Sequence, residues 1–247
     1  MTPGFTMHPN AKADPFATMP MRMQKLKRHQ IMGMNAPVPW FVTWLDANGE
    51  PTTYGEGTPD FRIADVRKIP LAIKNRLCWV CGEKLGNYMA FVIGPMCSIN
   101  RISAEPPCHH DCAIFSATAC PFLTRPRMRR NTKDLPEEHQ QPAGIMIERN
   151  PGVTAVWITK DYRLAKHDQG VLFKIGEPTN IFWFAQGRTA TRAEVQASID
   201  SGYPILLDMA LEESSEAVAE LAKQHQRAMQ YLPVDKGGKD GTATQSV

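Results

Sequence analysis

The sequence lacks the features that mark several large protein classes. No stretch approaches the roughly 18 apolar residues that span a bilayer, and the N-terminus lacks the continuous apolar run of a signal peptide. No glycine-rich phosphate loop, dinucleotide-binding fingerprint or Gly-x-Ser-x-Gly nucleophile elbow occurs. These absences argue against a membrane protein and against the nucleotide-binding enzymes and hydrolases that use such motifs. We therefore expect a cytoplasmic protein.

What is present is the composition of a globular protein. Of the 247 residues, 43% are hydrophobic and 21% are charged, while 20 Pro and 17 Gly indicate many loops and exclude a collagen or a coiled coil. The net charge of +3 is unevenly spread, with 17 Lys and Arg against 10 Asp and Glu up to Asp134 and 11 against 15 after it. The basic half could face an anion, but its charge is too dilute to identify a nucleic-acid binder.

Composition and hydrophobic patterning divide the chain into five predicted segments. Seven of the 13 Met lie near the N-terminus without apolar periodicity, which favours a disordered leader there. Further along, a run of Arg, Lys and Pro is typical of a linker. The segments are a disordered Met-rich leader (1–36), a β-hairpin plus zinc module (37–124), a basic linker (125–142), a β-meander plus helices (143–233) and a disordered tail (234–247).

The first half should contain short strands around one helix. Residues 40–45 and 52–54 are predicted to form a hairpin. Apolar spacing of three or four predicts a helix over 63–77, in which Pro70 must lie in the first turn or cause a kink. A second hairpin is predicted from residues 88–94 and 96–102.

The second half should be a small antiparallel meander followed by two helices. Thr191 and Glu194 have the spacing of a capping box, which would start the first helix, and Gly202 should end it. Pro204 then begins the approach to a second helix with one apolar stripe. The predicted strands are 153–159, 171–175 and 181–184, so the expected fold class is α+β.

The cysteines are gathered in one short region. A reduced intracellular chain keeps its thiols free, so this clustering favours metal binding over disulfides. The six are Cys78, Cys81, Cys97, Cys108, Cys112 and Cys120.

Two pairs of these residues have the spacing of metal ligands. Cys78 and Cys81, followed by Gly82, can turn as a knuckle that points both sulfurs at one ion. His109 and Cys112 are three residues apart at a predicted helix N-terminus, so they share one helix face. We therefore expect one Zn²⁺ per chain. Alternatives stay open: Cys108 could replace His109, His110 is a further candidate, and Cys97 and Cys120 are more typical of core thiols.

The order of knuckle, hairpin and helix resembles a treble-clef zinc finger over residues 76–123. The stretch Arg76–Gly82, with Pro106-Pro107, His109, Cys112-Ala113 and Ala119–Leu123, is also similar to a group of uncharacterised bacterial and bacteriophage proteins. Trp183–Ala185 and Thr191–Val195 are similar to the same group. This resemblance implies no activity.

The favoured function is that of a non-enzymatic binding or adaptor module with a structural zinc ion. A site with four protein ligands has no position for a catalytic water. The partner could be a protein or a nucleic acid, which the basic residues Arg125, Arg127, Arg129, Arg130 and Lys133 could contact. A zinc hydrolase or nuclease is the alternative, although the chain lacks the His-x-Glu of a deaminase. An iron–sulfur or redox protein is the third reading, since six thiols could hold a cluster.

Overall fold

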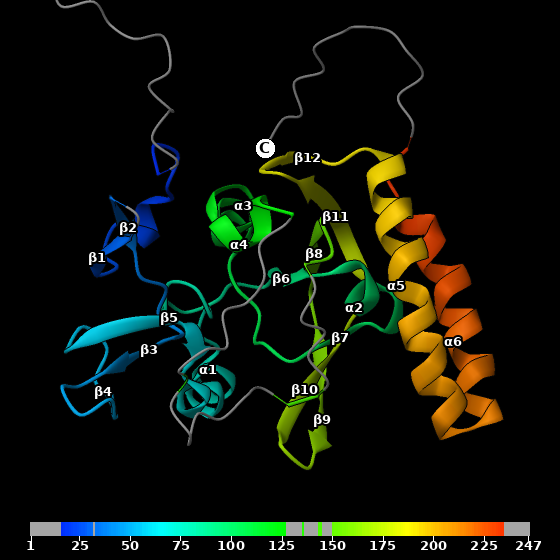
Figure 1. Ribbon diagram of the computed structural model, residues 1–247, viewed down its shortest axis with the longest axis horizontal. Coiled ribbons are helices and arrows are strands. Elements are labelled where there is room, and N and C mark those ends of the chain that lie inside the picture. Colours follow the sequence, from blue (N-terminus) through cyan, green and yellow to red (C-terminus); the bar gives the residue numbers. More distant parts are fainter. Residues whose placement is uncertain (1–15, 32, 127–134, 136–142, 145–149, 235–247) are drawn as a thin grey trace, which may run out of the picture.

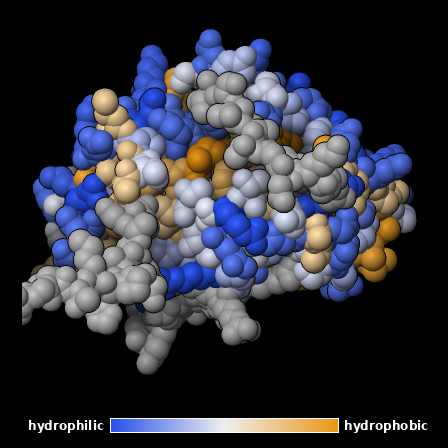
Figure 2. All heavy atoms as spheres, turned by 90° about the horizontal axis from the view of Figure 1, so that it is seen from above, coloured by the Kyte–Doolittle hydropathy of each residue, from blue (hydrophilic) through white to orange (hydrophobic). Residues whose placement is uncertain are grey.

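The computed structural model describes residues 16–31, 33–126, 135, 143–144 and 150–234. Within them the chain forms four antiparallel sheets and six α-helices, which confirms the expected mixture of helix and strand (Figure 1). No helix in this part of the chain is both long enough and apolar enough to cross a bilayer. The face seen in Figure 2 is mostly hydrophilic, with hydrophobic residues limited to small groups.

The central element is a four-stranded antiparallel sheet that joins distant parts of the sequence. Its β6 strand precedes the predicted linker, whereas its other strands follow that linker. Five pairs of residues link β6 to β8, with Phe91 opposite Trp157 at the centre. The segments on both sides of the linker therefore share one sheet. Its strands, in spatial order, are β12 (Arg188–Thr189), β11 (Pro178–Ala185), β8 (Thr154–Thr159) and β6 (Met89–Ile93).

Both faces of this sheet are buried. Successive side chains of a strand point to opposite faces, and in β8 Ala155 and Trp157 belong to one hydrophobic cluster while Val156 and Ile158 belong to another. All six residues of β8 are buried, which explains its continuous apolar sequence.

Helices cover the two faces (Figure 1). On one face lie α2 (Pro95–Asn100), α5 (Arg192–Glu213) and α6 (Ser215–Ala228), and α5 and α6 run side by side. On the other face α3 (His110–Ala119) contacts β6 and β8, and the short α4 (Pro121–Thr124) follows it. The sheet is thus the middle of three layers, and α3 holds the second ligand pair against it.

The helix α5 confirms one prediction and corrects another. Its capping box is present: Thr191 Oγ1 accepts a hydrogen bond from the Glu194 N–H at 3.2 Å, and Glu194 Oε2 accepts one from the Thr191 N–H at 2.9 Å. Hydrogen bonds from Arg188 and Thr191 lower the pKa of Glu194 to about 2. The predicted end at Gly202 is wrong, because the helix continues through Pro204 to Glu213. Gly202 is buried, and packing against α2 and α6 outweighs the local preference to stop.

The predicted first hairpin is confirmed and belongs to a three-stranded sheet with order β4-β3-β5. The predicted helix over 63–77 is only partly correct. Residues 58–64 are a strand, a 3-10 turn follows, and α1 spans only Ile69–Asn75, with Pro70 in its first turn. The strands of this sheet are β3 (Val42–Leu45), β4 (Pro51–Thr52) and β5 (Thr58–Ala64).

Two further predictions are wrong in the region of a third sheet. The segment 96–102 was expected to be a strand, but residues 95–100 form α2, where Pro95 suits a helix N-terminus. The second predicted hairpin is therefore wrong. Residues 162–167 lie between the predicted strands 153–159 and 171–175, but they form a further strand, β9. The sheet has the order β7 (Ile102–Ser103), β10 (Gly170–Ile175) and β9 (Tyr162–His167).

Part of the predicted leader is structured. Residues 16–36 contain a 3-10 turn at Met21–Met23 and a hairpin of β1 (Arg28–Ile31) and β2 (Met34–Pro37). The prediction of disorder is wrong here because Met23 and Leu26 are buried in the same hydrophobic cluster as α3. Residues 1–15, most of the linker and the tail from 235 onward lie outside the described residues, so the domain boundaries stay predictions.

Candidate metal centre

The first ligand pair lies in a tight hairpin turn between α1 and β6. Leu77 pairs with Lys84, and the Cys78 N–H donates to the Glu83 carbonyl at 2.7 Å. Gly82 has a φ of +76°, and its N–H donates to the Cys78 carbonyl at 2.8 Å. Gly82 thus adopts a left-handed conformation, as a glycine after the second cysteine can. The resulting turn is sharp enough for both sulfurs to face the same side.

The second ligand pair is held at the start of α3. His109 is the extended residue before the helix, and its carbonyl accepts the Ala113 N–H at 2.9 Å. The preceding Cys108 exchanges backbone hydrogen bonds with Ala90 of β6, both at 2.8 Å. The Trp79 N–H donates to the Pro107 carbonyl at 3.1 Å, which ties this segment to the knuckle. Backbone hydrogen bonds therefore hold both pairs together.

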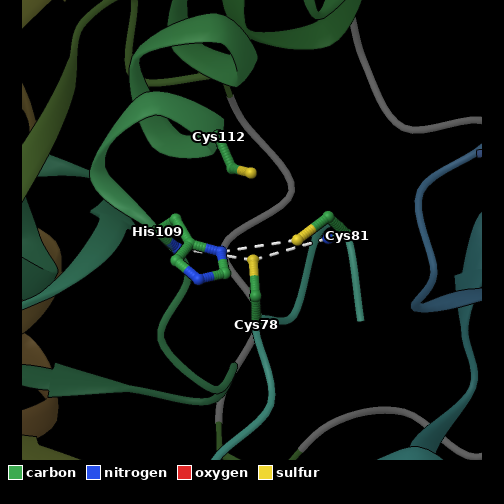
Figure 3. Close-up of side chains that lie close together, drawn as sticks. All are labelled: Cys78, Cys81, His109 and Cys112. Atoms are coloured by element: carbon green, nitrogen blue, oxygen red, sulfur yellow. Dashed lines mark hydrogen bonds between the residues drawn. The ribbon is translucent and has the colours of Figure 1, made fainter. Parts of the chain in front are cut away.

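Four side chains converge between these segments (Figure 3). The Sγ atoms of Cys78, Cys81 and Cys112 and a ring nitrogen of His109 all lie within 4.8 Å of one another, a group that could hold a metal ion. Cys81 Sγ lies 3.4 Å from His109 Nδ1. In a tetrahedral zinc site with ordinary bond lengths, sulfur and nitrogen ligands are about 3.6 Å apart and two sulfurs about 3.8 Å. The Cys81–His109 distance is close to this value, and the spread of the four donors is compatible with one metal ion.

The orientation of His109 suits a metal ligand. Its Nε2 lies 3.1 Å from the Lys84 carbonyl oxygen. A carbonyl only accepts hydrogen bonds, so this contact places a proton on Nε2 and turns Nδ1 toward the sulfurs, where it can bind a metal once its own proton is lost. Metal-binding histidines commonly have such a partner on the second nitrogen, which fixes the tautomer and the ring.

Backbone N–H groups also point at Cys78. The N–H groups of Cys81 and His109 both donate to its Sγ at 3.4 Å. Burial raises the pKa of Cys78, but hydrogen bonds from Cys112, Cys81 and His109 outweigh it and the net pKa is lowered. Burial lowers the pKa of His109, yet its hydrogen bond to Cys78 dominates and raises that pKa to about 10. Hydrogen bonds to Cys78 and Cys81 in turn raise the pKa of Cys112, so in the metal-free site Cys78 is favoured as the thiolate, the form of cysteine that binds metal, while Cys112 keeps its proton.

The group is largely shielded from solvent. Cys78 and Cys112 are fully buried, His109 is 8% exposed, and Cys81 is the most exposed of the four. Four protein donors in a buried setting are typical of a closed, structural metal site.

The other predicted candidates point elsewhere. Cys108 Sγ donates to the Ala90 carbonyl at 3.2 Å, and burial raises its pKa well above the usual value. His110 is exposed, and its ring stacks on Phe182 at 5.5 Å. Neither side chain belongs to the donor group. Cys97 and Cys120 also lie outside it, and burial raises the pKa of Cys97 to about 11. The geometry therefore favours His109 over its alternatives.

The predicted basic contacts are mostly outside the described part of the chain. Arg125 follows α4 and is exposed, and its carbonyl accepts a hydrogen bond from Asn150 at 3.2 Å. Arg127, Arg129, Arg130 and Lys133 fall among the residues that the structure does not describe. Their role as nucleic-acid contacts stays a prediction.

Sequence reasoning missed the residues that flank the donor group from the N-terminal side. Arg22 Nε donates to Asp111 Oδ2 at 2.8 Å, one residue before Cys112. Lys25 Nζ donates to Glu83 Oε1 at 2.9 Å, two residues after Cys81. The missed signal was a short apolar spacing of three, four and three residues, formed by Phe16, Met19, Met23 and Leu26.

Comparison with known protein families, with curated proteins and with solved structures finds no match for this chain. The treble-clef layout and the resemblance to bacterial and bacteriophage proteins therefore stay predictions, and function must be argued from the site itself.

Proposed function

We propose that the chain binds one structural zinc ion through Cys78, Cys81, His109 and Cys112. The observation that carries this proposal is the convergence of three thiols and one correctly oriented imidazole nitrogen within 4.8 Å. Thiolate and imidazole are the ligands that zinc prefers in structural sites. Iron–sulfur clusters are usually held by four thiolates, and Cys97, Cys108 and Cys120 are outside the group.

The ion would stabilise the junction between the knuckle and the central sheet. The knuckle is packed through the buried side chains of Trp79 and Val80, whereas α3 packs directly on β6 and β8. A metal bonded to the knuckle and to α3 would fix the knuckle against the central sheet. Trp79 of the knuckle packs on Trp40 and Phe41, which precede β3, so the metal would also fix the sheet β4-β3-β5. Such a closed site supports a non-enzymatic binding or adaptor module of a reducing, intracellular compartment, with a protein or nucleic-acid partner.

Elemental mass spectrometry on purified protein tests the proposal. Cys112→Ser should abolish stoichiometric zinc, because the hydroxyl of serine is a poor zinc ligand. Cys108→Ser is the matched control, since Cys108 is also buried, lies four residues away and donates to a carbonyl as a hydroxyl would. We expect one zinc per chain in the wild type and in the control. Iron instead of zinc, or zinc retained by Cys112→Ser, would contradict the ligand set.

The coordinating nitrogen can be identified separately. Because Nε2 of His109 is committed to the Lys84 carbonyl, zinc should bind through Nδ1. The ¹⁵N chemical shifts of the zinc-bound imidazole report which nitrogen carries the metal and which the proton. A zinc-bound Nε2 would show that the contact with Lys84 does not orient the ring.

A further inference from the structure

The segment 16–27, here called the N-terminal strap, runs beside the donor group. In Figure 1 this part of the chain lies next to α3. It consists of consecutive turns, in which the N–H groups of Met19, Met23 and Leu26 donate to carbonyls three residues earlier. Such turns leave few long-range backbone hydrogen bonds, so side chains must hold the strap in place.

Two ion pairs attach the strap to both halves of the donor group. Arg22 binds Asp111 on the first turn of α3, whereas Lys25 binds Glu83 of the knuckle. The partners are 89 and 58 residues apart in sequence, so the strap spans from one ligand pair to the other. Arg22 is 35% exposed, which places its charge at the boundary between solvent and the thiols.

Apolar contacts seat the strap more firmly than the ion pairs do. Met23 is 2% exposed and Leu26 is 7% exposed, and both belong to the hydrophobic cluster that includes Cys78 and Cys112. The Phe16 ring lies 6.4 Å from that of Phe115 on α3. Ion pairs that are half-exposed, as for Arg22, or largely exposed, as for Lys25, contribute little by comparison, so Met23 should be the main anchor.

We infer that the N-terminal strap is a cover that controls how fast metal enters and leaves the site. This inference rests on the proposed zinc binding. Of the four donors, Cys81 is the least buried, and Lys25 and Arg22 lie near it. Complete removal of the ion also requires access to Cys78 and Cys112, which are buried in one cluster with Met23 and Leu26, so the strap must open first.

The test measures the rate at which zinc passes from the loaded protein to an excess of a chromogenic chelator. Arg22→Gln should raise this rate up to about five-fold, the range of a half-exposed ion pair. Met23→Ala should raise it at least about thirty-fold, because it removes the buried anchor. Arg227→Gln is the control for Arg22, since the ion pair of Arg227 with Glu177 is also partly exposed and lies on α6, on the opposite face of the sheet. Leu221→Ala is the control for Met23, because it empties a buried site on the opposite face of the sheet.

Rescue by charge reversal separates a cover from a general loss of stability. Lys25→Glu should speed zinc release, and the added change Glu83→Lys should restore the wild-type rate, because the pair is re-formed with its charges exchanged. Equal acceleration by Met23→Ala and Leu221→Ala would overturn the inference, since release would then follow global stability alone. Unchanged rates in all strap variants would also overturn it while leaving zinc binding intact.

A second measurement needs no metal. Alkylation of the reduced, metal-free protein, mapped by mass spectrometry, should be faster at Cys81 in Arg22→Gln and Met23→Ala and unchanged at Cys120. Faster alkylation without stoichiometric zinc in the wild type would support the cover and refute the proposed zinc site. Unchanged alkylation in protein that does bind zinc would refute the cover alone.

Discussion

The packing of Trp40 on the knuckle yields a quantitative prediction. A Cβ added at Gly82 would lie 2.9 Å from Cγ and 3.1 Å from Cδ1 of Trp40, and the φ of +76° already disfavours alanine. The left-handed conformation should cost alanine about 1 kcal/mol. Displacing the Trp40 ring should weaken its edge contact with Trp79, 6.1 Å away, at a further cost of about 1 kcal/mol. Gly82→Ala should therefore lower the free energy of unfolding by about 2 kcal/mol.

A double-mutant cycle with Trp40→Leu isolates the ring contact. In the Trp40→Leu background the added Cβ no longer meets a ring, so Gly82→Ala should cost only the conformational part, about 1 kcal/mol. Urea unfolding followed by far-UV circular dichroism measures all four proteins, because that signal does not depend on the deleted tryptophan. The zinc content should be equal in the four, since neither residue is a donor.

Two results would refute this reasoning. If Gly82→Ala costs the same in both backgrounds, Trp40 is not what the new Cβ meets. If Gly82→Ala leaves the free energy of unfolding unchanged in both backgrounds, the knuckle does not need a glycine after its second cysteine.

Two other regions give simpler predictions. Glu194→Gln should destabilise the protein at neutral pH, because the carboxylate of Glu194 adds stability while it stays ionised beside Arg188. Its difference from the wild type should shrink as pH falls below about 4.5 and vanish only below about 2, the folded-state pKa of Glu194. Unfolding free energies measured across that range check this, and a difference as large at pH 2 as at neutral pH would contradict it. Gly176→Ala should lower the free energy of unfolding by more than about 3 kcal/mol, because its Cβ would collide with the Asp161 carboxylate and backbone. Gly86→Ala is the control. Its Cβ would meet nothing within 4 Å, so it should be nearly neutral in the same urea titration.

Local sequence patterns correctly predicted the features that depend only on nearby residues. The capping box of Thr191 and Glu194 needs only two side chains three residues apart, so its spacing alone predicted it. The knuckle is similar: two cysteines, two intervening residues and Gly82 specify the turn, and they formed as predicted.

Predictions failed where distant contacts outweigh local preference. The segment 96–102 has strand-like composition, but Pro95 begins a helix there, and that helix packs against α5 and α6. Gly202 and Pro204 are both helix breakers, yet α5 passes through them because its buried face is held by neighbouring helices. A single sequence contains no record of those neighbours.

The sequence by itself determined the chemistry of the candidate site. Six clustered thiols and a histidine three residues before Cys112 restricted the reading to metal, and the spacing named the same four residues that converge in space. Residue type and short spacing were enough because each ligand pair lies within a single turn of chain.

The tertiary structure places His109 in the group and Cys108 outside it, a choice that the spacing favoured but left open. Both flank the start of α3, and the choice depends on Ala90 of β6, whose carbonyl takes the Cys108 thiol, and on Lys84, whose carbonyl orients the His109 ring. The structure also shows the N-terminal strap packed on the rest of the chain, since most residues of the cluster that buries Met23 lie far along the sequence. Both outcomes depend on contacts across tens of residues, which no local pattern encodes.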